Sequence, residues 1–356
     1  MEHYTEYIPG ATLVIDKEKY RYFGGTAYLG LQADPDFQEL FIANVRNYGT
    51  AYGASRKSNV RLTIYDKAER FLADWTGSES SVTMSSGYLA GQLVANQFST
   101  PQYKVFYAPN CHPALFCSTG GSMQPKPYVT YTSLEIALRQ HLELKNGVTA
   151  VVFLDAIDFS GTNYPKFEGI KSLPLEDIIL VADDSHGIGL VGPGGAGVYP
   201  LLAQLEAKEL VVCCSLGKAL GIQAGAIFCS GLRYKSLTST EFFAGASPAA
   251  PAYLATLLQA RDLIQRKRIQ LSENISIFTS GIKDLHKLNS IANYPVFSAT
   301  GPKLNSFLFE NNVIVTHFSY PNEASPDSSR IVLNARHKRE DLEYLVNLLH
   351  HFFLKN

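Results

Sequence analysis

Three short apolar runs constrain the fold of this chain more than any other feature of its sequence. They cover residues 148–154, 178–182 and 210–214, and segments with helical patterns separate them. A strand that is apolar along its whole length is buried on both faces, as in a parallel sheet covered by helices. The alternation therefore predicts an α/β fold with a mainly parallel sheet over residues 46 to about 245.

The flanking segments predict the domain organisation. Residues 1–45 form an N-terminal segment, residues 46–247 a large domain and residues 248–356 a small C-terminal domain. Within the small domain the patterns predict a long helix from residue 248 to 271 or beyond, strands at 294–297, 313–316 and 330–333, and a closing amphipathic helix at 341–349.

Lys218 follows the third apolar run and lies between glycines, three residues after Ser215. In α/β sheets the ligand crevice opens at the carboxyl ends of the strands. A lysine amine partly withdrawn from water there loses some of its preference for the charged form, and only the neutral amine attacks an aldehyde to form an imine. A lone lysine in such a loop is more often solvated, so the neighbouring groups decide its interpretation.

Asp183 and His186 follow the second apolar run, and a parallel sheet brings them to the same edge as Lys218. Further upstream, residues 81–95 predict a strand, a Ser-Ser-Gly turn and a helix. The backbone N–H groups at such a helix start bind anions, so a phosphate site is expected there. His112 precedes a helix that is predicted to begin at proline.

These groups together meet the demands of pyridoxal 5′-phosphate (PLP). A buried carboxylate such as Asp183 would keep the pyridine nitrogen protonated, which makes the cofactor a strong electron sink. His186 would face the ring hydroxyl, His112 would stack on the ring and Ser215 would reach a phosphate oxygen. Each histidine alone is more often an ordinary packed or surface residue, and only the joint pattern favours a cofactor site.

The chain resembles the α-oxoamine synthases, a family of fold-type I PLP-dependent enzymes. The resemblance runs from residue 48 to residue 335. It implies a large domain with a mainly parallel sheet of the seven-stranded type and a small C-terminal α/β domain. Four motifs carry it, namely Ser85-Ser86-Gly87-Tyr88, Cys111-His112, Asp183-Asp184-Ser185-His186-Gly187-Ile188-Gly189 and Ser215-Leu216-Gly217-Lys218.

The resemblance also implies roles for individual residues. Lys218 holds the cofactor covalently and carries out the chemistry with His112, while Ser247 reaches the phosphate of a neighbouring subunit. A homodimer with shared active sites follows, and no metal is implied. The implied cofactor-binding set is Ser86, Gly87, Tyr88, His112, Asp183, His186, Ser215, Lys218 and Ser247.

Three departures from the family pattern bear on the substrate. Thr26 stands where an asparagine is usual, and Val332 stands where the second of two arginines grips the carboxylate of the amino acid. Neither residue replaces a bidentate, charge-assisted hold on a carboxylate. Ala156 replaces a serine, which would remove one cofactor contact. Candidate substitutes for the carboxylate clamp are Arg56, His317 and Arg330.

Composition excludes several other classes of protein. A formal net charge of −1 with 18% charged residues leaves no electrostatic footprint for nucleic acid or an anionic membrane surface. The five cysteines are odd in number and show no Cys-x-x-Cys pair, so reduced, packed thiols are expected. The first residues lack a signal-peptide pattern, and a cytoplasmic location is expected. The Asn-Ile-Ser sequence at Asn274 lies in a predicted helix and is interpreted as no glycosylation site.

Three functions remain open at this point. The first is a transferase that joins a small amine to an acyl thioester such as an acyl-CoA. The second keeps PLP but catalyses transamination or carbon–carbon cleavage on an amine that lacks the usual carboxylate clamp. The third is a binding protein with the cofactor fold and no turnover, which the nearly complete cofactor set disfavours.

Overall fold

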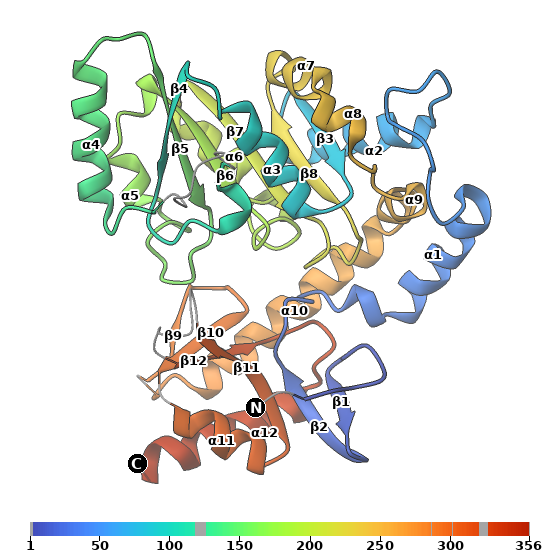
Figure 1. Ribbon diagram of the computed structural model, residues 1–356. Helices are drawn as coiled ribbons and strands as arrows, with labels where there is room; N and C mark the ends of the chain where they lie inside the picture. Colours follow the sequence, from blue (N-terminus) through green and yellow to red (C-terminus); the bar gives the residue numbers. More distant parts are fainter. Residues whose placement is uncertain (1–2, 118–125, 286, 301, 320–326, 356) are drawn as a thin grey trace. The chain divides into compact units, whose positions relative to one another are not determined.

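The computed structural model describes residues 3–117, 126–285, 287–300, 302–319 and 327–355. Backbone contacts divide the chain into two compact units (Figure 1). Unit 1 consists of Met1–Gln38 together with Asp262–Asn356, and unit 2 of Glu39–Arg261. The domain boundaries expected after residues 45 and 247 enclose the part of the chain predicted to bind the cofactor, and they stay a prediction.

Unit 2 contains a six-stranded sheet in the order β3-β8-β7-β6-β5-β4. Strands β4 to β7 are parallel to one another, and β8 runs antiparallel to both of its neighbours. The mainly parallel sheet is thus confirmed, with six strands among the described residues where the resemblance implied seven. The strands are β3 Ser80–Met84, β4 Tyr103–Tyr107, β5 Thr149–Asp155, β6 Ile178–Asp183, β7 Glu209–Ser215 and β8 Gly225–Cys229.

The central strands of this sheet are buried almost along their whole length, because helices cover the sheet. Helix α3 packs on β7 and β8, helix α4 packs on β4 and β5, and helix α2 packs on β3 and α9 (Figure 1). The α-helices, counting α1 at the border between the units, are α1 Pro35–Tyr48, α2 Thr63–Thr76, α3 Gly87–Gln97, α4 Tyr131–Glu143, α5 Glu168–Lys171, α6 Tyr199–Leu202, α7 Gly231–Ser239, α8 Glu241–Gly245 and α9 Pro251–Gln259.

Unit 1 is built from both ends of the chain. Its sheet has the order β1-β2-β11-β12-β10-β9, in which only the β2–β11 pair is parallel. The strands are β1 Thr12–Ile15, β2 Glu18–Phe23, β9 Asn289–Ser290, β10 Val296–Thr300, β11 Val313–Ser319 and β12 Asp327–Val332. The helices are α10 Arg261–Gly281, α11 Pro302–Glu310 and α12 Arg339–Lys355. The three strands and the closing helix predicted for this region are present.

The single long helix expected from residue 248 is wrong. The structure has two helices there, α9 and α10, and Ala260 between them leaves the helical conformation with φ −86° and ψ 10°. The N–H of Ala260 still bonds to the carbonyl of Thr256 at 2.9 Å. No glycine or proline marks this break, so a sequence pattern cannot place it.

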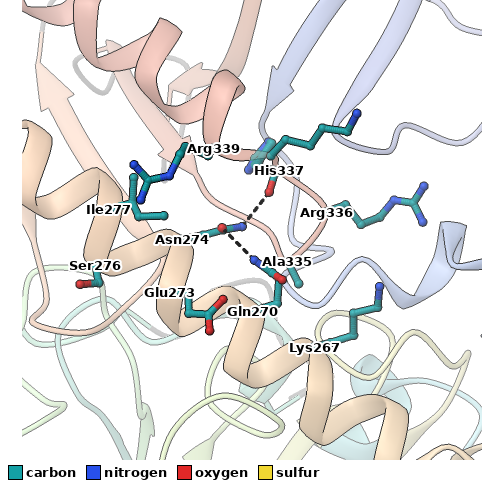
Figure 2. A pocket seen from close by; sticks show the side chains of 11 residues that line it. Lys267, Gln270, Glu273, Asn274, Ser276, Ile277, Ala335, Arg336, His337 and Arg339 are labelled. Atoms are coloured by element: carbon teal, nitrogen blue, oxygen red, sulfur yellow. Dashed lines mark hydrogen bonds between the residues drawn. The ribbon is translucent and has the colours of Figure 1, made fainter.

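Asn274 on α10 fastens the loop that precedes α12. Its side-chain amide donates to the carbonyl oxygen of His337 at 3.0 Å (Figure 2) and to that of Asn334 at 2.9 Å, both inside unit 1. Asn274 is 1% exposed, which confirms that its Asn-Ile-Ser sequence is no glycosylation site.

A cavity of about 810 Å³ beside Asn274 is lined by several basic side chains. Two of them already have acidic partners, since Lys267 contacts Asp34 at 2.6 Å and Arg339 contacts Glu343 at 3.2 Å.

The thiols agree with the expectation that they are reduced and packed. All five cysteines are free and buried. In the part of the chain that the structure describes, no helix is both long and apolar enough to cross a membrane. Within the same residues, no group of three or more His, Cys, Asp or Glu side chains is arranged to hold a metal ion.

Candidate active site

Two aspartates end neighbouring parallel strands of unit 2. Asp155 ends β5 and Asp183 ends β6, and the two residues are paired in register. Asp183 accepts a hydrogen bond from the N–H of Ser185 at 2.8 Å, which fixes its carboxylate beside the following turn. Burial and the nearby Asp183 raise the pKa of Asp155 well above its usual value. Sequence reasoning found Asp183 and missed Asp155.

Lys218 lies in the tight loop between β7 and β8. Two backbone hydrogen bonds close this loop, from Leu216 N to Ala224 O at 2.9 Å and from Ile222 N to Leu216 O at 3.2 Å, and the side chains of Leu216 and Ile222 are buried. The Lys218 Nζ comes within 2.7 Å of His186 Nε2. The predicted meeting of these two side chains at one sheet edge is therefore present in the structure.

The electrostatic environment of Lys218 favours its neutral form. Burial lowers the pKa of this amine, and the carboxylates of Asp183 and Asp155 partly oppose the shift. A neutral amine can attack an aldehyde, whereas an ammonium cannot. The chemistry expected of Lys218 thus has a structural cause in the loop that withdraws it from water.

The turn after β6 aims His186 at Lys218. Asp184 in this turn is 1% exposed, accepts a hydrogen bond from Val198 N at 2.9 Å and has a pKa raised well above its usual value by burial. A Cβ at Gly187 would lie 2.0 Å from Asp184 Oδ1, so only glycine fits beside this carboxyl group. Phe159 packs edge-to-face on the His186 ring, with centroids 4.7 Å apart.

The start of α3 lies where the sequence predicts an anion site. Ser86 is the N-cap, and its hydroxyl accepts a hydrogen bond from Leu89 N at 3.1 Å. The first N–H groups of a helix have no carbonyl partner within it, so those of Gly87 and Tyr88 can bind an anion. A Cβ at Gly87 would lie 2.5 Å from the Cβ of Ser215, which shows how closely this helix start approaches the end of β7.

His112 is held from two sides. Its backbone N–H donates to Asp155 Oδ1 at 2.9 Å, and its ring Nδ1 accepts from Ala114 N at 3.1 Å. Burial lowers the pKa of His112 against the opposing effect of Asp183, so the ring is neutral at pH 7 with its hydrogen on Nε2. The helix expected at this point is a single 3-10 turn, Pro113–Leu115.

Two other expectations about the cofactor site stay predictions. Ala156 is fully buried, and its N–H bonds to Asp183 O at 2.9 Å. The expected loss of a cofactor contact at Ala156 is not decided by this position. Ser247 is exposed in the segment between α8 and α9, and its role toward a neighbouring subunit stays a prediction.

Arg56 is unavailable as a carboxylate clamp. Its guanidinium makes a bidentate contact with Glu69, at 2.8 and 3.0 Å, and lies over the ring of Tyr65 at 4.1 Å from the centroid. This paired arrangement is largely buried. A guanidinium that already holds one carboxylate with both nitrogens cannot hold a second one in the same way.

The remaining substrate-related positions lie in unit 1. Val332 at the end of β12 is buried, and it is paired with Val296. Arg330 on the same strand lies opposite Thr316, and His317 Nδ1 is 3.4 Å from the hydroxyl of Ser329. Thr26 follows Gly25, whose N–H bonds to the Thr316 hydroxyl at 2.9 Å. Which of these residues meets a substrate stays a prediction.

The residues of unit 2 fit PLP. The fit rests on a buried amine of lowered pKa beside an imidazole, a carboxylate that ends the adjacent strand, and a helix start that only glycine can bring against β7. These features correspond to the aldehyde, the pyridine nitrogen and the phosphate of that cofactor. Eight residues of the predicted set, all on this sheet edge or at the α3 start, are Ser86, Gly87, Tyr88, His112, Asp183, His186, Ser215 and Lys218.

Solved structures share this fold. Serine palmitoyltransferase from Sphingomonas wittichii superposes with a TM-score of 0.81 at 18% identity, covering 98% of this chain and 91% of the other. A structure described as serine palmitoyltransferase with PLP gives a TM-score of 0.83 at 16% identity, with coverage of 98% and 92%. At these identities the likeness establishes the architecture alone.

Sequence relatives and a family model extend the comparison. The 8-amino-7-oxononanoate synthase of Pectobacterium atrosepticum is 26% identical over 96% of this chain and 91% of its own length. A protein described as a putative 8-amino-7-oxononanoate synthase from Bacillus cereus is 24% identical over 98% and 91%. The family model for aminotransferase class I and II matches residues 26–349. Because this match spans most of the sequence, the chain belongs to the family of class I and II aminotransferases.

Proposed function

We propose that this protein is a PLP-dependent acyltransferase of the α-oxoamine synthase type, which joins an amino compound to an acyl thioester. One observation carries the proposal: Lys218, His186 and Asp183 converge at a single sheet edge, in a chain that aligns over 96% of its length with an 8-amino-7-oxononanoate synthase. The relatives supply the type of reaction, and the site supplies the groups that it needs.

The residues of unit 2 divide the work among them. When bound, PLP would withdraw electrons from the carbon that bears the amino group of the substrate. The N–H groups of Gly87 and Tyr88, with the Ser215 hydroxyl, would hold the phosphate. Asp183 would accept a hydrogen bond from the protonated ring nitrogen, and the Lys218 amine would hold the cofactor and then move a proton at Nζ. His112, neutral and fixed by its backbone, would lie against the ring.

The amine substrate is proposed to differ from an ordinary α-amino acid. Thr26 and Val332 occupy the positions of the usual carboxylate clamp, and Glu69 already engages Arg56. An amine whose carboxylate needs no bidentate arginine fits this set of side chains better. We further propose a homodimer in which Ser247 serves the partner's site, and a cytoplasmic location.

An absorbance experiment tests the function. Purified protein with added PLP is expected to be yellow, and the Lys218→Ala variant is expected to lose this retained colour after gel filtration. Amines that perturb the spectrum are then offered with acyl-CoA. Release of free CoA supports condensation, whereas formation of a keto product with pyridoxamine phosphate would establish transamination instead. A protein that stays colourless with PLP would refute both reactions.

A further inference from the structure

Asp155 lies at this sheet edge and has no role in the proposed reaction. It ends β5 directly beside Asp183 at the end of β6, so the two carboxyl groups leave adjacent strands at the same level. Lys218 also lies within electrostatic range of both. Two ionised carboxylates on adjacent strands would repel each other in a site withdrawn from water, so one of the two is expected to stay protonated.

The backbone contacts distinguish the two acids. Asp155 Oδ1 accepts the N–H of His112 at 2.9 Å, and the carbonyl of Asp155 accepts the side-chain amide of Asn163 at 2.6 Å. Asp183 instead accepts from Ser185 N in its own turn. Asp155 thus reaches across to the segment that carries His112, while Asp183 stays with the turn that carries His186.

We propose that Asp155 is a positioning residue that acts in its protonated form and fixes the backbone of His112. This inference deepens the proposed function and rests on its PLP site. Burial and Asp183 both favour the neutral form of Asp155, and the opposing effects of the His112 N–H and Lys218 are smaller than burial. The titratable groups that face it from the surrounding elements are Asp183, Lys218, Asp158, His112, Cys111, Cys213 and Tyr131.

Substitutions separate the hydrogen bond from the charge. Asp155→Asn keeps an oxygen for His112 N–H and resembles a neutral carboxyl group, whereas Asp155→Ala removes the acceptor. Asp158→Asn is the matched control, because Asp158 also interacts with Asp155 yet its carboxylate bonds to the Ser160 hydroxyl and Gly161 N. Melting temperatures establish that each variant folds, and Asp155→Ser replaces the alanine variant if that one does not.

The first measurement is hydrogen–deuterium exchange of the peptide containing His112 in protein freed of cofactor. Exchange is expected to accelerate in Asp155→Ala and to stay unchanged in Asp155→Asn and Asp158→Asn. This readout needs neither PLP nor substrate, so it reports on Asp155 even if the proposed function fails. Unchanged exchange in Asp155→Ala would overturn the positioning role.

The second measurement is the dissociation constant of PLP and the pH midpoint of its visible absorbance. Asp155→Ala is expected to weaken PLP binding by about tenfold, in line with the loss of one hydrogen bond to the backbone of His112. Asp155→Asn is expected to bind like the parent and to move the absorbance midpoint by less than about half a pH unit, because no negative charge is lost. A shift of about one unit or more in Asp155→Asn would show that Asp155 is ionised and would overturn the inference.

Discussion

At the scale of single residues, the reactivity of Lys218 depends on a balance between burial and nearby carboxylates. Burial lowers its pKa, and Asp183 is the strongest of the groups that hold the pKa up. The Lys218 Nζ also lies 2.7 Å from His186 Nε2, which gives the amine a polar partner. A small change in the surrounding charge therefore changes the fraction of Lys218 that can react.

The Asp183→Asn variant tests this balance. Removing the carboxylate takes away a group that stabilises the ammonium, so the pKa of Lys218 falls further and its neutral form persists to lower pH. The rate at which PLP labels Lys218 in cofactor-free protein, trapped with borohydride and read by mass spectrometry, is expected to reach half-maximum at lower pH than in the parent. A midpoint that moves to higher pH would contradict this account.

The buried ion pair of Arg56 and Glu69 leads to a second prediction at this scale. Their side chains are 10% and 7% exposed and stand 2.8 Å apart. Arg56→Met leaves a buried carboxylate without its cation and is expected to cost about 3 kcal/mol of unfolding free energy. The double variant Arg56→Met with Glu69→Gln is expected to recover part of that loss, as measured by denaturant unfolding. Equal losses in the single and double variants would argue against a buried pair.

Residues that end strands could be predicted from the sequence, and residues defined by tertiary partners could not. Asp183, His186 and Lys218 follow apolar runs, which is sufficient to place them at one edge. Asp155 follows such a run too, and the same rule would have found it. The pairing of Arg56 with Glu69 and the burial of Ala156 depend on side chains brought together only by the fold.

At the scale of elements, the position of α3 depends on a glycine at its first residue. A Cβ at Gly87 would lie 2.6 Å from Ser215 Cα and 2.8 Å from Ser215 N, which are backbone atoms that cannot move aside easily. Gly225 faces the same junction, because a Cβ there would lie 2.2 Å from Ser86 O. The anion site and the end of β7 are consequently a single close-packed unit.

Gly87→Ala is expected to push α3 away from β7. The predicted cost is about 1–3 kcal/mol in stability from overpacking, together with weaker binding of PLP because the phosphate-binding N–H groups shift. Gly245→Ala is the matched control, since it also lies in a helix of unit 2 and a Cβ there meets nothing within 4 Å. Thermal melting and PLP titration measure the two effects. Equal behaviour of both alanine variants would contradict the packing argument.

The elements differ in how well the sequence predicts them. Strands β5, β6 and β7 lie within a residue or so of the predicted runs, because each buried strand is apolar throughout. The β1–β2 hairpin was not foreseen. Its turn places Asp16 and Lys17 at φ 49° and 72°, a conformation that Asn-Gly pairs usually signal. Long-range pairing of β2 with β11 gives this hairpin its place in the unit 1 sheet.

At the scale of the whole molecule, the two units carry buried titratable groups of opposite kinds. His337 in unit 1 accepts from Asn334 N and donates to Tyr22 O, and burial lowers its pKa to about 4. Asp184 in unit 2 has a pKa raised by burial. Between pH 6.5 and 4, His337 takes up a proton in the unfolded state but stays neutral in the folded state. The unfolding free energy of unit 1 therefore falls by up to about 3 kcal/mol as the pH falls over this range. Over the same range the neutral form of Asp184 becomes more favourable, and unit 2 is strengthened.

Acidification is therefore expected to separate the unfolding of the two units. Trp75, the only tryptophan, lies in α2 of unit 2 and donates to Gly194 O at 3.2 Å, so its fluorescence reports unit 2. Circular dichroism reports the helices of both units. At pH 4.5 the guanidinium midpoint by circular dichroism is expected to fall below that by fluorescence, and His337→Gln is expected to narrow the gap. Coincident midpoints at pH 4.5 would contradict independent acid responses.

The sheet order of unit 2 also affects how the protein acquires its cofactor during synthesis. Strand β3 leads into α3, yet among the described strands it pairs with β8, which comes last of that sheet along the chain. A nascent chain therefore cannot complete this edge until Cys229 has left the ribosome, because contacts between distant segments form only after the intervening chain is available. Because residues 80–97 emerge long before β8, we expect the proposed site to be completed only late in translation, after most strands of the large sheet have been synthesised.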